Sequence, residues 1–326
     1  MDHVNWGIIG CGNVTEKKSG PAFNKIEGSR LIAVMRRDAL KAEDYARRHG
    51  VPKFYSDATL LINDPDVNAV YIATPPDTHA KYAIETMKAG KAVYVEKPMA
   101  RTVAECEEMI RVSEETGQPL FVAYYRRRLP VFLKIKELVE NGVIGDVKYI
   151  HVQLHNPFKP EETEPGKAPD WRLIPEISGG GHFHDLAAHQ FDYLEYLLGH
   201  IKDAKGISLN QTGHYPADDI TTATFLFESG IAGTGSWCFS VPENLKDDTT
   251  ILIGSEGKIT FSFFEHQNIL VEKSDGSHQN YTLPHPENIQ QPLIQTIVDQ
   301  LLGKSESPST GKTGIRSSMI MEWITS

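Results

Sequence analysis

The first third of the chain alternates short, continuous hydrophobic runs with segments of helical periodicity. The hydrophobic runs read "NWGIIG", "RLIAVM", "NAVYIAT", "KAVYVEKP" and "PLFVAYY". Runs that are apolar throughout, rather than at every second position, are typical of strands buried on both faces of a parallel sheet. We therefore expect these five segments to form adjacent parallel strands.

Two of the intervening segments have the spacing of amphipathic helices. In "THAKYAIETMKAG" apolar residues recur at i, i+3, i+4 and i+7, and Gly90 follows where a helix is expected to end. The segment "TVAECEEMIRVSEETG" repeats this pattern and closes on Gly117. Regular alternation of strands and helices predicts a doubly wound α/β sheet.

The pattern changes after about residue 128. Val131, Ile135 and Leu138 have helical spacing, whereas in "KITFSFF" every second residue is hydrophobic. Such alternation predicts antiparallel strands with one covered face and one open face. We expect an α/β protein with an N-terminal Rossmann doubly wound parallel sheet in residues 1–127. Residues 128–326 should form an α+β domain built on a mainly antiparallel open sheet that binds substrate and mediates oligomerisation.

The segment "NPFKPEETEPGKAPDW" lacks any hydrophobic period and is rich in proline, glutamate and glycine. We interpret it as a loop. A loop of this length is typically a lid or rim of a binding site.

Composition excludes several classes of function. The 326-residue chain is 40% hydrophobic and has a formal net charge of −10, which disfavours nucleic acid as a partner. Its three cysteines, Cys11, Cys106 and Cys238, are far apart and indicate neither a disulfide framework nor a thiolate zinc site. We expect no secretion signal, because "MDHVNWGIIG" lacks a basic region followed by an apolar stretch, and no run approaches the ~18 apolar residues of a membrane span. We expect a cytoplasmic protein that does not bind membranes.

A glycine pair follows the first predicted strand. In "VNWGIIGCGNV" Gly10 and Gly12 end the strand, where a tight turn can present backbone N–H groups to a pyrophosphate at the start of a helix. Thr15 occupies the position of the third glycine of the dinucleotide motif, and a lone pair of glycines also occurs in ordinary turns. The position of the pair at the start of a β-α series favours dinucleotide binding.

The end of the second predicted strand bears on cofactor choice. An acidic residue there would bind the ribose hydroxyls of NAD, but "LIAVMRRD" places Arg36 and Arg37 at this point. Guanidinium groups suit the 2′-phosphate of NADP. The alternative is a pair of solvated surface arginines, and Asp38 beside them keeps NAD possible.

The stretch "GGGHFHDLAAHQFD" concentrates three histidines and two aspartates. Asp185 and His189 are four residues apart and would share one face of a helix that starts near Asp185. A metal site is an alternative, because His182 and His184 are also ligand types. A purely structural alternative makes Asp185 a helix cap and His189 a buried hydrogen-bonded residue.

The ordered motifs along nearly the whole chain resemble the Gfo/Idh/MocA oxidoreductase family. They run from "GIIGCGNV" through "DPDVNAVYIATPPDTHA", "AGKAVYVEKP", "YYRR" and "WRLIPEISGGG" to "STGKTGIRS". Each motif alone is common, but their order and spacing together are specific. The resemblance implies a Rossmann domain with a Glu-Lys-Pro motif, followed by a domain that carries the Gly-Gly-Gly, Asp and His pattern.

The resemblance also implies site residues. The catalytic set would be Lys97, Asp185 and His189, which would bind substrate together with Tyr125 and Arg126. The predicted cofactor-binding residues are Gly10, Gly12, Asn13, Val14, Arg36, Arg37, Thr74, Pro75, His79, Glu96, Lys97, Trp171 and Arg172. We expect no metal.

This set suits hydride transfer between a nicotinamide cofactor, NADP or alternatively NAD, and a carbinol carbon. Imidazole, with a pKa of about 6.5, can take the hydroxyl proton, and a lysine can stabilise the developing alkoxide. The expected substrate is a small polyhydroxylated molecule: a sugar, anhydrosugar or cyclitol. Alternatives are an NAD-dependent glycoside hydrolase and a non-catalytic nicotinamide-binding regulator. The family resemblance and the open sheet further predict a homodimer or homotetramer.

Overall fold

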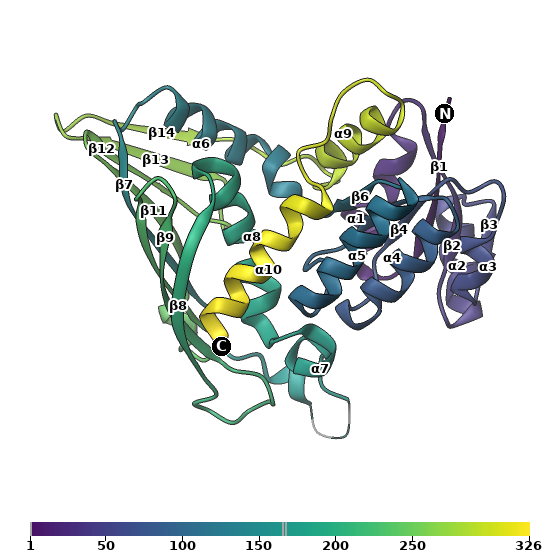
Figure 1. The fold of residues 1–326 in the computed structure, drawn as a ribbon. Coiled ribbons are helices and arrows are strands. Elements are labelled where there is room, and N and C mark those ends of the chain that lie inside the picture. The colour runs from purple at the N-terminus through teal and green to yellow at the C-terminus, as the bar shows by residue number, and fades with distance from the viewer. Residues whose placement is uncertain (1, 165, 167) are drawn as a thin grey trace. The chain divides into compact units, whose positions relative to one another are not determined.

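The computed structural model describes residues 2–164, 166 and 168–326, and the chain divides into two compact units (Figure 1). Unit 1 comprises residues 1–127 and 286–316, and unit 2 comprises residues 128–285 and 317–326. The observed division thus differs from the expected one, which placed residues 286–316 in the second domain. They join unit 1 through long-range contacts, such as the isolated bridge between Phe121 and Thr310, that no local pattern reveals.

Unit 1 is built on a six-stranded sheet in the order β3-β2-β1-β4-β5-β6, with every neighbouring pair parallel. This confirms the predicted Rossmann doubly wound sheet. Its strands are β1 (Val4–Ile9), β2 (Ser29–Met35), β3 (Lys53–Tyr55), β4 (Ala69–Ile72), β5 (Ala92–Val95) and β6 (Leu120–Val122). Its helices are α1 (Asn13–Lys17), α2 (Ala39–His49), α3 (Ala58–Ile62), α4 (His79–Lys88), α5 (Val103–Thr116) and α9 (Gln291–Leu301).

The central strands of unit 1 are continuously apolar because both of their faces are covered. Every residue of β4, β5 and β6 is buried. Strand β3, by contrast, is a three-residue edge strand without a buried residue, so it lacks the hydrophobic run that identifies the others. Burial on two faces is therefore the property that the sequence pattern detects.

Unit 2 contains an eight-stranded sheet in the order β14-β13-β12-β11-β7-β10-β9-β8. Only the pair β7 and β10 is parallel, which confirms the expected mainly antiparallel sheet. Its strands are β7 (Val147–His155), β8 (Ile201–Leu209), β9 (Ile220–Phe227), β10 (Ala232–Cys238), β11 (Asp247–Gly254), β12 (Gly257–Phe261), β13 (Asn268–Lys273) and β14 (His278–Thr282). Its helices are α6 (Pro130–Glu140), α7 (Pro175–Ser178) and α8 (Gly181–Leu198), and α10 (Gly311–Thr325) ends in this unit.

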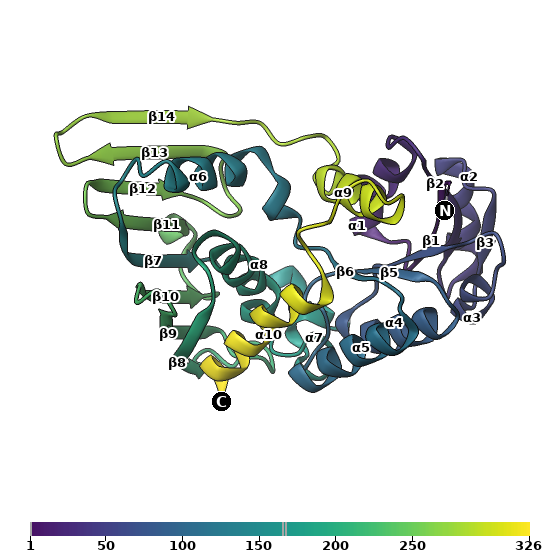
Figure 2. The same cartoon turned by 45° about the horizontal axis from the view of Figure 1, so that its top comes forward.

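Helices α6 and α8 cover one face of the second sheet (Figure 2). Alternate residues of β7 and β10 point toward this covered face, as the buried side chain of Trp237 illustrates. Its indole Nε1 donates to Gln190 Oε1 on α8 at 2.6 Å, and its ring packs edge-on against Phe183. These contacts fix α8, and with it the chemistry that α8 carries, on a rigid support.

The segment between β7 and α7 is largely irregular, as its composition predicts, and contains two short 3-10 turns, η4 (Pro160–Thr163) and η5 (Trp171–Leu173). Residues 165 and 167 of the expected loop lie outside the described residues. Across the part of the chain that the structure describes, no helix is both long and apolar enough to cross a bilayer.

Candidate active site

The turn after β1 depends on a glycine with a left-handed backbone. Gly10 has φ +92°, and a Cβ atom added there would lie 2.8 Å from Thr74 Cγ2 and 2.9 Å from the carbonyl of Ala73. A side chain would therefore push the turn after β1 away from the turn after β4. Glycine at this position lets the two turns approach closely.

Gly12 meets a different requirement. It caps α1, and an added Cβ would have only the carbonyl oxygen of Gly10 within 4 Å, at 3.8 Å. Open space beside the backbone at this point fits the close approach of a pyrophosphate, with Asn13 and Val14 opening the helix behind it. The turn thus has the form that a dinucleotide cofactor requires.

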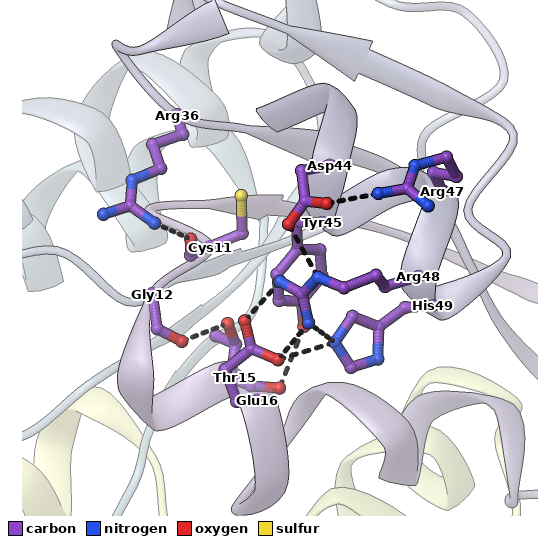
Figure 3. A network of polar contacts seen from close by, with 10 residues as sticks. All are labelled: Cys11, Gly12, Thr15, Glu16, Arg36, Asp44, Tyr45, Arg47, Arg48 and His49. Carbon is purple, nitrogen blue, oxygen red and sulfur yellow. Dashed lines mark hydrogen bonds and ion pairs between the residues drawn. The ribbon is translucent and has the colours of Figure 1, made fainter. Parts of the chain in front are cut away.

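The short helix α1 is tied to α2 by hydrogen bonds (Figure 3). Thr15, which replaces the third glycine of the motif, is buried, and its hydroxyl donates to the carbonyl of Gly12 at 2.8 Å. The buried Tyr45 hydroxyl of α2 donates to the carbonyl of Thr15 at 2.8 Å. Thr15 therefore stabilises the turn through its own hydroxyl, and Tyr45 of α2 adds a second hydrogen bond from the neighbouring helix.

A charged cluster extends the same connection at the surface. Arg48 of α2 pairs with both carboxylate oxygens of Glu16, at 2.7 and 2.9 Å, and the ring of His49 lies 2.8 Å from Glu16 Oε2 (Figure 3). The hydrogen bond from Arg48 is the main reason why the pKa of Glu16 falls to about 2. Glu16 is therefore ionised throughout the neutral range.

The arginines after β2 take different positions. The guanidinium of Arg36 donates to the carbonyl of Cys11 at 3.3 Å, between the two glycines of the turn (Figure 3). Arg37 is exposed. Asp38 is the N-cap of α2, where it accepts from the backbone N–H of Lys41 at 3.2 Å. The acid near this strand is thus engaged in capping, while an arginine contacts the glycine turn.

A buried histidine joins the loops that follow β4 and β5. His79 Nε2 lies 2.8 Å from the carbonyl oxygen of Thr74, and its Nδ1 lies 3.0 Å from that of Pro98. Burial lowers the pKa of His79, although both carbonyls oppose this effect. The carbonyl of Pro75 accepts from the backbone N–H of Thr78, which closes the turn before α4. His79 therefore links the loop after β4 to the loop after β5.

Glu96 is also a buried connecting residue. Its carboxylate accepts from the Tyr71 hydroxyl and, at 2.6 Å, from Nε2 of Gln290. Its second oxygen accepts from the backbone N–H of Lys97 at 3.2 Å. Gln290 Oε1 in turn accepts from the Tyr94 hydroxyl at 2.8 Å. The residue before Lys97 is therefore fixed by groups from two strands and from the returning segment 286–316.

Lys97 follows β5 at the carboxyl edge of the parallel sheet, the edge at which α/β sheets bind ligands. Tyr125 and Arg126 follow β6 at the same edge, in the 3-10 turn η3 (Tyr125–Arg128). Both side chains are buried, and the Arg126 guanidinium lies 5.2 Å from the centre of the Tyr125 ring. Unit 1 thus places its predicted substrate-binding residues at one sheet edge.

In unit 2 the glycine run forms the entrance to α8. Gly179, Gly180 and Gly181 all have positive φ, at +89°, +154° and +79°. Only glycine adopts positive φ values without steric cost, which explains why all three of these positions are glycine. The helix begins at Gly181, so Asp185 lies inside it, and the interpretation of Asp185 as a helix cap is wrong.

Asp185 and His189 are separated by four residues on α8 and lie on one face of it. Arg172 Nε donates to Asp185 Oδ2 at 3.2 Å, and the same guanidinium contacts Asp170 at 3.3 Å. Burial alone would lower the pKa of Arg172, but the two carboxylates raise it. The guanidinium also lies 4.3 Å from the centre of the Trp171 ring, which fixes its plane. His189 is almost fully buried.

The remaining histidines of the cluster point to separate partners. His182 Nε2 lies 2.9 Å from Glu162 Oε2, and His184 Nδ1 lies 3.1 Å from the carbonyl oxygen of Gly180. Burial lowers the pKa of His184 to about 4, so its ring is neutral at pH 7. Within the described ranges, no group of three or more His, Cys, Asp or Glu side chains is arranged to hold a metal ion.

The predicted residues therefore fall into two groups. Unit 1 contains the glycine turn, the arginines after β2, the loops after β4 and β5, and Lys97; unit 2 contains Asp185 and His189 with Trp171 and Arg172. Sequence reasoning missed the supports of these groups. Tyr45 gave no local signal, and Gln290 lies 194 residues from Glu96 along the chain, beyond any local pattern.

Comparison with known proteins gives consistent matches. Residues 4–124 match a family model described as "Oxidoreductase family, NAD-binding Rossmann fold", and residues 132–260 match one described as "GFO/IDH/MocA C-terminal domain". Oxidoreductase P35 of Formosa agariphila is 42% identical over 324 residues, which cover 98% of this chain and 97% of that protein. The scyllo-inositol 2-dehydrogenase (NAD(+)) of Bacillus subtilis is 30% identical over 285 residues, 85% of this chain and 79% of that protein.

Among solved structures, levoglucosan dehydrogenase in complex with NADH and levoglucosan superimposes with a TM-score of 0.87. The identity is 22%, and the match covers 99% of this chain and 96% of the other. At this identity the likeness concerns the fold, including the pairing of a parallel sheet with a mainly antiparallel one along the chain.

Proposed function

Because the chain belongs to the Gfo/Idh/MocA family and is an NAD(P)-dependent oxidoreductase, we propose that it oxidises a secondary hydroxyl of a sugar, anhydrosugar or cyclitol, or reduces the ketone. The observation that carries this proposal is the placement of Asp185 and His189 on one face of α8, with Arg172 as a cationic partner for Asp185. The names of the relatives, among them an inositol dehydrogenase, support the substrate class.

In the proposed reaction His189 takes the hydroxyl proton of the substrate, because an imidazole suits proton transfer near neutral pH. The Lys97 ammonium stabilises the alkoxide that develops on the same oxygen. Asp185 holds the hydroxyl and the imidazole in place, and Arg172 orients its carboxylate. A bound nicotinamide supplies the hydride acceptor.

We also propose that the cofactor is preferentially NADP. Arg36 contacts the glycine turn at Cys11, and Asp38 is engaged in capping α2. An arginine at this place adds attraction for a 2′-phosphate, and it removes the repulsion that an acid would exert. The further cofactor contacts proposed are those of the glycine turn and of Thr74, Pro75 and Trp171.

The central experiment measures nicotinamide absorbance with a panel of sugars, anhydrosugars, cyclitols and polyols, each with NAD and with NADP. Net turnover with at least one compound is the expected result. Release of sugar from a glycoside without net turnover would identify the hydrolase alternative. Cofactor binding with neither reaction would identify a regulator and overturn the proposal.

The open face of the second sheet is the proposed surface of self-association. Along the central strands β7 and β10 every residue on this face is only partly buried or exposed, whereas on the covered face every residue except Lys148, near the start of β7, is buried. Two copies that pair these faces would form a homodimer or, by further pairing, a homotetramer. Sedimentation at micromolar concentration tests this, and a monomer there contradicts it.

A further inference from the structure

A small cavity in unit 2 lies beside α8 and has no role in the chemistry above. The cavity has a volume of about 30 Å³, counted as the space that the centre of a water molecule can occupy. One water needs roughly 10–15 Å³ of such space, so the cavity has room for about two non-hydrogen atoms. It is lined by Asn156, Pro157, Phe158, Lys159, Glu162, His182, Leu186, Tyr215 and Phe239.

One wall of the cavity carries a buried carboxylate. The side chains of Glu162 and His182 are 14% and 12% exposed and lie 2.9 Å apart. Burial on its own would raise the pKa of Glu162, but the hydrogen bond with His182 and neighbouring positive charges hold it below the ordinary value. The Glu162 carboxylate is therefore ionised and available as a hydrogen-bond acceptor.

A second wall carries a phenol. Tyr215 is 6% exposed, and its hydroxyl has no hydrogen-bond partner among the described residues. Burial raises the pKa of Tyr215, so the hydroxyl keeps its proton and remains a donor. Its ring is held by Phe158 and His182, at centroid distances of 6.2 and 6.1 Å. A buried hydroxyl without a partner is unfavourable, and a ligand that pairs with it regains that free energy.

The rest of the lining consists of four apolar residues, Pro157, Phe158, Leu186 and Phe239, and of the polar Asn156 and Lys159. The Lys159 ammonium lies 3.7 Å from Glu162 Oε1 and adds to the positive charge beside that carboxylate. An acceptor and a donor beside four apolar side chains match a hydroxyl on an apolar carbon. A hydroxyl both donates and accepts, and the carbon that bears it prefers apolar contact.

We propose that this cavity binds the hydroxymethyl group of a sugar or polyol substrate, with its hydroxyl donating to Glu162 and accepting from Tyr215. The inference rests on the proposed function, since that function places the substrate against Asp185. His182 and Leu186 of the cavity and Asp185 and His189 of the catalytic set occupy positions i, i+4, i+3 and i+7 of one helix. They share one broad face of α8, and His182 lies about 4.5 Å along the axis from Asp185.

The experiment compares a matched pair of substrates. The best substrate of the panel that carries a hydroxymethyl group is assayed beside its deoxy analogue, which has a methyl group instead. The value of kcat/KM for each compound is measured for wild type, Glu162→Gln and Tyr215→Phe. The control is Glu161→Gln, which changes the neighbouring exposed glutamate in the same way.

Wild type should prefer the hydroxymethyl compound by about 100-fold or more, because a site built to pair a hydroxyl rejects an analogue that lacks it. Tyr215→Phe and Glu162→Gln should each reduce this ratio at least tenfold, through slower turnover of the hydroxymethyl compound. Their kcat/KM for the methyl analogue should stay close to the wild-type value. The control should keep the full ratio.

Three results overturn the subsite while leaving the proposed function intact. They are a wild-type ratio near one, an unchanged ratio in both cavity variants, and a best substrate that lacks any hydroxymethyl group. The cavity would then hold only water.

If no compound of the panel is turned over, the proposed function fails separately. Saturation-transfer NMR with methyl glucoside and its 6-deoxy analogue then decides on the cavity. Binding of the hydroxymethyl compound alone, lost in Tyr215→Phe, supports the subsite. Equal binding, or no binding of either, overturns it.

Discussion

The glycine turn of unit 1 and the helix α8 of unit 2 carry the proposed chemistry in opposite ways. The turn offers backbone and empty space, since Gly10 and Gly12 have no side chains to present. Helix α8, which begins directly after the glycine run, offers the side chains of Asp185 and His189, and Arg172 holds the carboxylate of Asp185. Cofactor binding at the turn should be weakened when a side chain is added to either glycine. Catalysis at α8 should be lost when a catalytic side chain is removed.

The largest effect is expected from removing groups. His189→Ala and Lys97→Met should each lower kcat by roughly 10²- to 10⁴-fold, because the proton acceptor or the stabilising charge is lost. Cofactor affinity should change little. Steady-state kinetics combined with cofactor titration measures both quantities.

The control for this pair is His200→Ala, since the side chain of His200 is 60% exposed, two residues beyond the end of α8. Its kinetics should match wild type. Near-normal turnover in either catalytic variant would contradict the proposed assignment.

Adding a methyl group to each glycine tests the other side of the comparison. In Gly12→Ala the new Cβ has open space and an extended backbone, so stability should be kept while the dissociation constant of the cofactor rises by about tenfold or more. In Gly10→Ala the left-handed φ alone costs about 1–2 kcal/mol, and the Ala73 carbonyl adds a clash, so thermal stability should fall as well.

Thermal unfolding and fluorescence titration separate the two glycine variants. Equal loss of stability in both would mean that the space beside Gly12 is not reserved for a ligand. Full cofactor affinity in Gly12→Ala would contradict the assigned role of this turn.

A smaller effect is expected from the arginine beside the turn. Arg36→Asp should lose about tenfold or more in NADP affinity and gain affinity for NAD, because a charge-assisted hydrogen bond is replaced by repulsion. Arg47→Gln, at an exposed position of α2, is the control. Tighter binding of NAD than NADP by wild type, or an unchanged NADP affinity in the variant, would reverse the proposed preference.

The smallest effect concerns the surface support of the turn. The folded-state pKa of Glu16, about 2, lies below its ordinary value of 4.5, so its pairing with Arg48 stabilises the fold above pH 4.5 and is lost as the pH falls toward 2. Since both side chains are partly exposed, Glu16→Gln should cost only about 0.2–1 kcal/mol at pH 7. Urea unfolding at pH 7 and pH 3 measures the difference, which should shrink at the lower pH.

Features that depend on neighbouring residues in the sequence could be predicted, whereas contacts between distant segments could not. Strands of the parallel sheet are found from their hydrophobic runs because burial on both faces leaves no room for polar residues. The glycine turn and the α8 cluster are local in sequence, so their spacing is enough to propose them as candidate sites. Supports made by distant segments are invisible in this way: Tyr45 beneath Thr15 and Gln290 against Glu96 look like ordinary residues until the chain is folded.

The residues that line the cavity beside α8 show a second reason why parts of the molecule could not be predicted from the sequence. Glu162, His182 and Tyr215 come from a loop, a helix and a connection between two strands, and nothing in their local sequences relates them. The sequence marks His182 only as a candidate metal ligand, because a local pattern of histidines does not reveal which carboxylate the ring contacts in the folded chain. Side-chain partners across elements depend on tertiary packing rather than on periodicity.

The return of residues 286–316 to unit 1 also sets an order of events during synthesis. A ribosome releases the chain from its N-terminus, so Tyr94 and Glu96 emerge more than 190 residues before their partner Gln290. The buried carboxylate of Glu96 lacks this partner for most of translation. The nucleotide-binding half of the molecule, although encoded first, is therefore completed only after most of unit 2 has been made.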